Sequence, residues 1–215
     1  MSRQRSKPIV LGVIHGQFHV PKSERQMIAR EKERVLQVLE RLPPGTRVGI
    51  EAPRKGLDRL GAYSNSRDVL TFAARTARRL DHEIVALDLD SALRRHDQIT
   101  LQIHHFEDQL RCLEPLGLPT GTLNHHIDRL FIKQYALAII RSVLIGKRIN
   151  KEKPQVAVIG DTHARDLKNV LQSTHQVMLS PAGSDMPIDF VSNPLIAPLK
   201  AKLDAHLLKR LKPSK

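Results

Sequence analysis

The stretch Gln155-Val156-Ala157-Val158-Ile159-Gly160-Asp161-Thr162-His163 combines the two features on which the fold and the candidate site depend. Its first half is an apolar run of strand length with several β-branched residues, which is typical of a strand buried on both faces of a sheet. The run ends at a glycine, an acid and a histidine. The stretch therefore predicts a buried strand whose carboxyl end carries groups that can do chemistry.

Further apolar runs of this kind are separated by amphipathic helical patterns. The expected strands are residues 9–14, 47–51, 83–88 and 155–160, with edge-type strands at 176–179 and 188–191. Helical spacing of apolar residues covers most of the chain between them. The alternation predicts an α/β fold with a mostly parallel sheet covered by helices on both faces. The helical pair between Ser91 and Gly146 is expected to be an insertion or cap.

The length of 215 residues and the 40% hydrophobic content suit a single α/β domain with a buried core. No polar linker long enough to separate a second domain is present. We expect a basic N-terminal extension at residues 1–7, the α/β domain at residues 8–194, and a basic amphipathic C-terminal helix at residues 195–215.

The chain is strongly basic, with 35 Lys and Arg residues against 22 Asp and Glu residues and a formal net charge of +13. The positive electrostatic field of such a chain attracts polyanions, and the C-terminal helix is the expected contact. An alternative function is therefore a nucleic-acid-binding or ribosome-associated protein without catalysis. Aromatic residues make up only 3% of the chain, and no helix-turn-helix, zinc-finger or aromatic RNA-binding pattern is present. These absences argue against nucleic-acid binding.

The compartment is indicated by what the sequence lacks. A single cysteine, Cys112, cannot form an internal disulfide and is expected to be a small buried residue. The apolar run 135–140 meets Arg141 well short of the roughly 20 residues that a membrane span needs. We therefore expect a cytoplasmic protein with no membrane span.

Polar side chains follow each strong strand at the point where it ends. Because ligands of parallel sheets bind outside the carboxyl ends of the strands, these groups are expected to meet at one edge. Imidazole and carboxylate groups are suitable ligands for Zn, Mn or Co, which can activate water for hydrolysis. Taken singly, Asp88 and Asp161 could instead cap a helix or form a turn, and His15 could be a hydrogen-bonded structural group, whereas Glu51 is of a residue type that caps helices poorly. The candidates are His15, His19, Glu51, Asp88, Asp90, Asp161 and His163.

A glycine stands three residues before a histidine twice, in the segments 12–15 and 160–163. The glycine is expected to let the chain bend sharply as the strand ends. With the segments 48–51 and 86–90, and with Asp128-Arg129 opening a helix, this order of motifs over residues 8–171 resembles the TraB/PrgY/Tiki family. That family lies within the grouping of erythromycin-esterase-like and ChaN-like proteins.

The resemblance implies a metal-dependent hydrolase acting on amide or peptide bonds, with Glu51, Arg129 and His163 as site residues. The fourth residue it implies is His15 or His19, because residues 16–19 also place a glycine three residues before a histidine. Asp161 stands where the family usually has a small residue, and it is either a further ligand or a sign of different chemistry. The expected substrate is a small molecule or a peptide.

A second possible enzymatic function is indicated by Asp161-Thr162-His163, which is similar to the opening motif of calcineurin-like metallophosphoesterases. In those proteins the motif lies near the N-terminus and is followed by further Gly-Asp and Gly-Asn-His segments, which are absent here. The metal-dependent amide hydrolase is therefore the preferred prediction. Glu51 is its expected general base or metal ligand, and Asp88 and Asp90 are supporting groups.

Overall fold

The computed structural model describes residues 7–14, 22–59, 68–181 and 205. His15 and His19 therefore lie outside the described residues, as do the edge strand expected at 188–191 and nearly all of the expected C-terminal helix. The predictions made for these segments stay predictions.

The described residues form one sheet of five parallel strands in the order β3-β2-β4-β1-β5. The prediction of an α/β fold with a parallel sheet is confirmed. Each strand is about as long as its apolar run, because the run is what the two covering layers bury. The strands are β1 (Ile9–Val13), β2 (Arg47–Ile50), β3 (Glu83–Ala86), β4 (Val156–Gly160) and β5 (Gln176–Met178).

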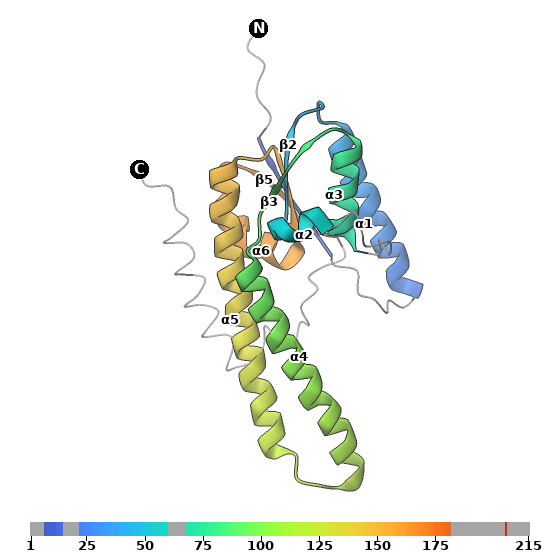
Figure 1. The fold of residues 1–215 in the computed structure, drawn as a ribbon, viewed down its shortest axis with the longest axis vertical. Coiled ribbons are helices and arrows are strands. Elements are labelled where there is room, and N and C mark those ends of the chain that lie inside the picture. Colours follow the sequence, from blue (N-terminus) through green and yellow to red (C-terminus); the bar gives the residue numbers. More distant parts are fainter. Residues whose placement is uncertain (1–6, 15–21, 60–67, 182–204, 206–215) are drawn as a thin grey trace.

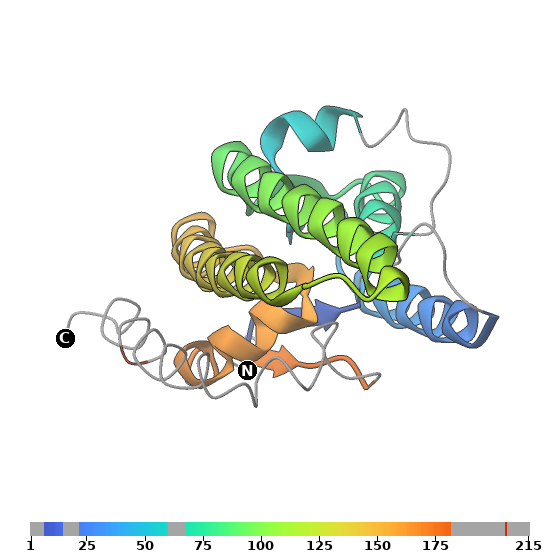
Figure 2. The same cartoon turned by 90° about the horizontal axis from the view of Figure 1, so that it is seen from below.

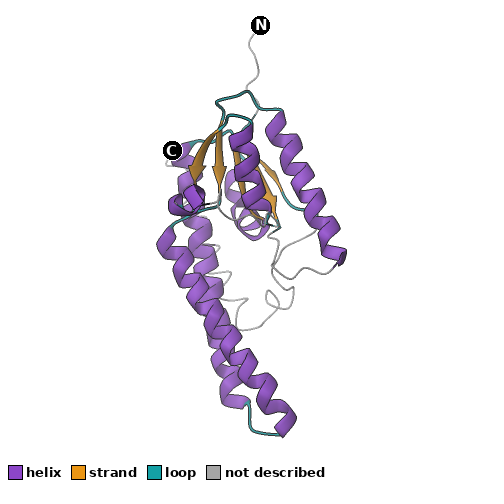
Figure 3. Cartoon of the chain, turned by 45° about the vertical axis from the view of Figure 1, so that its right-hand side comes forward, coloured by secondary structure: helices purple, strands orange, loops and turns teal. Residues whose placement is uncertain are grey.

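Helices cover both faces of the sheet (Figure 3). Alternate residues of a strand enter opposite layers, as its pleat requires. Leu11 and Val13 of β1 pack with α1 and α3 in one core, whereas Val10 packs with α5 and α6 in the other. The helices are α1 (Lys22–Glu40), α2 (Arg54–Arg59), α3 (Val69–Arg79), α4 (Asp90–Leu113), α5 (Gly121–Glu152) and α6 (Asp161–Leu171), with a 3₁₀ turn at Glu114–Leu116.

Two helices differ from the prediction. The Gly-, Ser- and Asn-containing sequence of residues 55–66 predicts a connection, but its first part belongs to α2, which is anchored by the buried Leu57. Helix α5 was expected to end at Gly146 but continues to Glu152. Ile145 and Ile149 on either side of that glycine are fully buried, and their burial outweighs the cost of about 1 kcal/mol for a glycine inside a helix.

Helices α4 and α5 form an antiparallel hairpin that extends beyond the carboxyl ends of the strands (Figure 1). Seen from that end, the two helices lie side by side (Figure 2). A hydrogen bond of 2.8 Å from Gln134 Nε2 to Thr100 Oγ1 sets their register. The expected insertion is therefore a hairpin whose sheet-proximal part lies near the strand ends. Within the described ranges, no helix has the length and apolar character needed to cross a membrane.

Gly12 is required because there is no space for a side chain at its position, and not because the chain bends there. It lies inside β1, and a Cβ atom at this position would come within 2.8 Å of both Ala164 Cβ and Asp161 Oδ1. The absence of a side chain lets the start of α6 approach β1 closely. The sharp bend expected at Gly12 is thus wrong, although the glycine itself is explained.

Candidate active site at the carboxyl edge of the sheet

Glu51 lies at the point where the connections of two neighbouring strands diverge. The chain leaves β2 for β3 on the face covered by α3, and it leaves β4 for β5 on the opposite face through α6. Ligand sites of open parallel sheets form at such a switch point. The Glu51 N–H donates to the Val158 carbonyl at 3.0 Å, and Glu51 Oε2 accepts from the Gly160 N–H at 2.5 Å. The carboxylate is therefore fixed between the ends of β2 and β4.

Arg141 on α5 joins Glu51 to Asp88, which follows β3. Its Nη2 atom lies 2.8 Å from Glu51 Oε1 and 2.6 Å from Asp88 Oδ2, and its Nε atom donates to the same Asp88 oxygen at 3.2 Å. All three side chains are buried. Burial opposes the charged form of Arg141, but the two carboxylates outweigh it and raise its pKa above the usual value. One fixed cation thus compensates two buried carboxylates.

His163, in the first turn of α6, contacts the same carboxylate from the other side. Its Nε2 atom lies 3.3 Å from Glu51 Oε1, and its Nδ1 atom lies 2.7 Å from Ser142 Oγ. Ser142 Oγ also lies 2.7 Å from Asp166 Oδ2. Because the serine has a single hydroxyl hydrogen and a carboxylate is the stronger acceptor, Ser142 donates to Asp166 and accepts from His163 Nδ1. We call Glu51, Asp88, Arg141, Ser142 and His163 the edge cluster.

His96 on α4 lies near enough to the edge cluster for the charges of Arg141 and His163 to act on it. Since Thr100 pairs with Gln134, His96 lies one helical turn away at the level of Ala138, the residue whose carbonyl oxygen lies 3.1 Å from Ser142 Oγ. Burial lowers the pKa of His96 most, and the charges of Arg141 and His163 lower it further, whereas Asp97 raises it. The imidazole is half-buried and is held neutral near pH 7.

Of the residues that the sequence singled out, the structure brings together Glu51, Asp88 and His163. It does not bring Asp161 to them. Asp161 Oδ1 accepts from the Ser180 N–H and Oδ2 accepts from Arg165 Nε, both at 2.5 Å. Its carboxylate is fully buried in these contacts, which fix the start of α6 to the chain after β5. Its expected role as a further ligand is therefore not supported.

Arg129 is exposed on α5, three turns of helix before Arg141. The arginine that contacts Glu51 is Arg141, and the structure does not bring Arg129, the position implied by the family resemblance, to the edge cluster. Asp90 is the first residue of α4, next but one to Asp88. His15 and His19 lie outside the described residues.

The sequence carries a signal for Arg141. Arg141 is the only charged residue between Lys133 and Lys147, and the apolar neighbours on both sides show that this part of α5 is buried. An arginine in such a run needs a buried acid. Ser142 and His96 had no comparable signal, because the residue of the edge cluster that both of them interact with, His163, belongs to an element far away in the chain.

The donor set does not fit a metal centre as it stands. Both oxygens of Glu51 are engaged, and the Arg141 guanidinium holds the place between Glu51 and Asp88 that a divalent cation would need. The described ranges contain no group of three or more His, Cys, Asp or Glu side chains able to hold a metal ion. The predicted Zn, Mn or Co ion stays a prediction that depends on His15 and His19.

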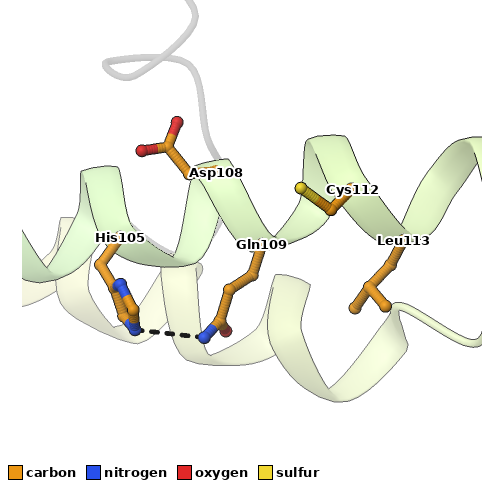
Figure 4. Close-up of a pocket in the computed structure, with 5 residues that line it drawn as sticks. All are labelled: His105, Asp108, Gln109, Cys112 and Leu113. Carbon is orange, nitrogen blue, oxygen red and sulfur yellow. Dashed lines mark hydrogen bonds between the residues drawn. The ribbon is translucent and has the colours of Figure 1, made fainter.

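A separate cavity of about 420 Å³ lies on the outer part of α4, lined by His105, Asp108, Gln109, Cys112 and Leu113 (Figure 4). His105 and Gln109 are linked by a hydrogen bond of 3.1 Å. Cys112 is exposed, so the expectation that it is buried is wrong. The cavity lies on the projecting hairpin and shares no residue with the edge cluster.

Comparison with known proteins does not assign this chain to a family. No protein-family model, no curated protein and no solved structure matches this chain. The similarity to the TraB/PrgY/Tiki family therefore stays a prediction from its motifs, and the chemistry of the site is argued from the geometry of the edge cluster.

Proposed function

We propose that this protein is a hydrolase that cleaves an amide or peptide bond at the carboxyl edge of its sheet. One observation carries the proposal: Glu51 Oε1 is shared by a guanidinium at 2.8 Å and an imidazole at 3.3 Å at the switch point of the fold. A cluster of buried charges is costly, and clusters of titratable groups at such positions are typical of active sites.

Arg141 is the electrophilic group in this proposal. Its Nε and Nη2 atoms are bound by the two carboxylates, whereas Nη1 makes no hydrogen bond to any described residue. The guanidinium is held in place before a substrate arrives. Nη1 can therefore donate to the substrate carbonyl oxygen and stabilise the negative charge that develops there during attack.

His96 is the general base. A base must be neutral to accept a proton, and the lowered pKa of His96 keeps it so near pH 7. It removes a proton from the attacking water as the new carbon–oxygen bond forms. The same proton then passes to the leaving nitrogen as the carbon–nitrogen bond breaks, so that the base is restored.

His163 and Ser142 are positioning residues for Glu51. The Ser142 contact fixes the ring of His163, and the ring in turn fixes Glu51 Oε1 against Arg141. Glu51 and Asp88 together hold the guanidinium in one orientation. No step of the proposal uses a metal ion.

The test is hydrolysis of a panel of p-nitroanilides and short peptides by the purified full-length chain and by His96→Gln. General-base catalysis contributes a factor of about 10² to 10⁴, so His96→Gln should lower kcat by at least about 100-fold. His125→Gln is the matched control, because His125 is exposed on the outer part of α5.

Circular dichroism spectra verify that both variants are folded. The proposal fails if the wild type hydrolyses nothing in the panel. It also fails if folded His96→Gln keeps the wild-type kcat.

A further inference from the structure

A second cavity lies along the open edge of β3, the outermost strand on one side of the sheet. Its volume is about 590 Å³, which is within the range of about 300–1,000 Å³ typical of small-molecule sites. We call it the β3-edge cavity. Its lining residues are Arg54, Leu57, Arg78, Ile84, Val85, Ala86, Arg148, Lys151 and Glu152.

The lining is dominated by positive charge, with four cationic side chains and one carboxylate. Two of the cations are held in place by backbone carbonyls. Arg148 Nη1 donates to the Ala86 carbonyl at 2.9 Å, and Arg78 Nη2 donates to the Leu57 carbonyl at 2.6 Å. Neither guanidinium is neutralised by these contacts, because a carbonyl carries no net charge. Both keep donors for an anion.

Arg54 and Lys151 are the other two cations, and both are exposed. No described residue forms a hydrogen bond or an ion pair with either side chain. Like charges gathered around one cavity repel each other, and a bound anion would relieve that repulsion. The cavity thus presents two preorganised cations and two adaptable ones.

The strand edge adds backbone donors. The N–H groups of Glu83 and Leu87 are used by the segment around β2, at 3.0 and 2.9 Å. Because the hydrogen-bonding direction alternates along a strand, the N–H groups of Ile84 and Ala86 face the opposite side, toward the cavity. Oriented backbone N–H groups beside cations are a common way of binding phosphate oxygens.

The same edge is not suited to an added β-strand. Arg148 occupies the Ala86 carbonyl, which an incoming strand would need for its ladder. Leu57 and the side chains of β3 give the cavity a nonpolar part as well. A compact ligand with an anionic end and a nonpolar end matches this division better than an extended peptide does.

We propose that the β3-edge cavity binds a phosphorylated small molecule that carries at least two phosphate groups and a nonpolar moiety. The cavity shares no lining residue with the edge cluster, so the proposal does not depend on the hydrolase assignment. Phosphate is favoured because clustered guanidinium groups match its geometry and its multiple charges.

The experiment is isothermal titration calorimetry of the full-length protein with two probes, pyrophosphate and ADP, both without added metal. The variant is Arg54→Gln/Lys151→Gln, since neither side chain has a partner among the described residues whose loss would unfold the chain. We expect both probes to bind, and the variant to weaken the dissociation constants by at least about tenfold. ADP should bind more tightly than pyrophosphate, because the nonpolar part of the cavity contacts its nucleoside.

The matched control is Arg30→Gln/Lys133→Gln, which removes the same two charge types from exposed positions on α1 and α5. The control should keep both dissociation constants within about twofold of wild type, because a distant charge is largely screened. If both double variants weakened probe binding equally, the effect would come from the net charge alone, and the proposal would be overturned. The proposal would also be overturned if neither probe bound but a single-stranded RNA of about 12 nucleotides did. That result would favour nucleic-acid binding.

Discussion

The Nη2 nitrogen of Arg141 lies 2.6 Å from Asp88 Oδ2, although the two residues are 53 positions apart in the chain. The contact ties α5 to the end of β3, and the same nitrogen reaches Glu51 at the end of β2. Two strand ends and one helix are thus held by a single buried cation.

Arg141→Gln should strongly destabilise the protein. The variant leaves two buried carboxylates without their cation, which costs about 3–5 kcal/mol of the free energy of unfolding. Arg129→Gln is the control and should change that free energy by no more than about 0.5 kcal/mol, because its side chain is exposed. Urea unfolding followed by circular dichroism measures both. Equal effects of the two variants would contradict the buried position of Arg141.

Asp97→Asn should shift the acid limb of the pH–rate profile to lower pH. Asp97 raises the pKa of His96, against the lowering by burial, Arg141 and His163. Removing its charge lowers that pKa further, so His96 stays neutral at more acid pH. The pKa can be followed by NMR of the labelled imidazole, with Asp108→Asn on the outer part of α4 as the control. A shift of the limb toward higher pH would exclude His96 as the base.

The protein should lose stability as the pH falls below about 6.5. Burial lowers the pKa of both His96 and His175 in the folded state. The unfolded chain therefore takes up protons first, and stability falls between the ordinary pKa of 6.5 and the lowered folded values. Urea unfolding at about pH 7.5 and about pH 5.5 tests this, and His175→Gln should reduce the difference. A difference that His175→Gln leaves unchanged would remove His175 from the explanation.

Gly12→Ala should destabilise the protein by about 1–3 kcal/mol, because its Cβ atom has no space between β1 and the start of α6. Gly121→Ala is the opposite case. Nothing lies within 4 Å of a Cβ atom built there, and alanine is the better helix former, so its free energy of unfolding should stay equal or rise. Thermal unfolding of the two variants measures the contrast, and a neutral Gly12→Ala would show that α6 can move away from β1.

Hydrolysis should survive treatment with EDTA, because Arg141 already supplies the positive charge between Glu51 and Asp88. The measurement is kcat before and after chelation, together with the metal content of the purified protein. Loss of activity that Zn, Mn or Co restores would instead support the metal site predicted with His15 and His19.

The fold was predictable because its strands are short, apolar and buried on both faces, so burial alone sets their limits. The positions of Glu51 and Asp88 followed from the same reasoning, since the end of a strand fixes its next residues. Arg141 could not be placed in this way. A helix of 32 residues presents many arginines and lysines, and only its packing decides which of them faces a carboxylate. The sequence pattern also predicts that α5 ends at Gly146. The helix continues past this glycine because Ile145 and Ile149 are buried.

The strand order has a consequence for how the chain assembles during synthesis. Strands β1 and β2 are never hydrogen-bonded to each other, because β4 lies between them and pairs with both. The centre of the sheet therefore cannot form until β4 has left the ribosome, whereas the α4–α5 hairpin joins neighbouring segments and can form earlier. Glu51 acquires the Gly160 N–H, and with it its fixed orientation, only at that late step.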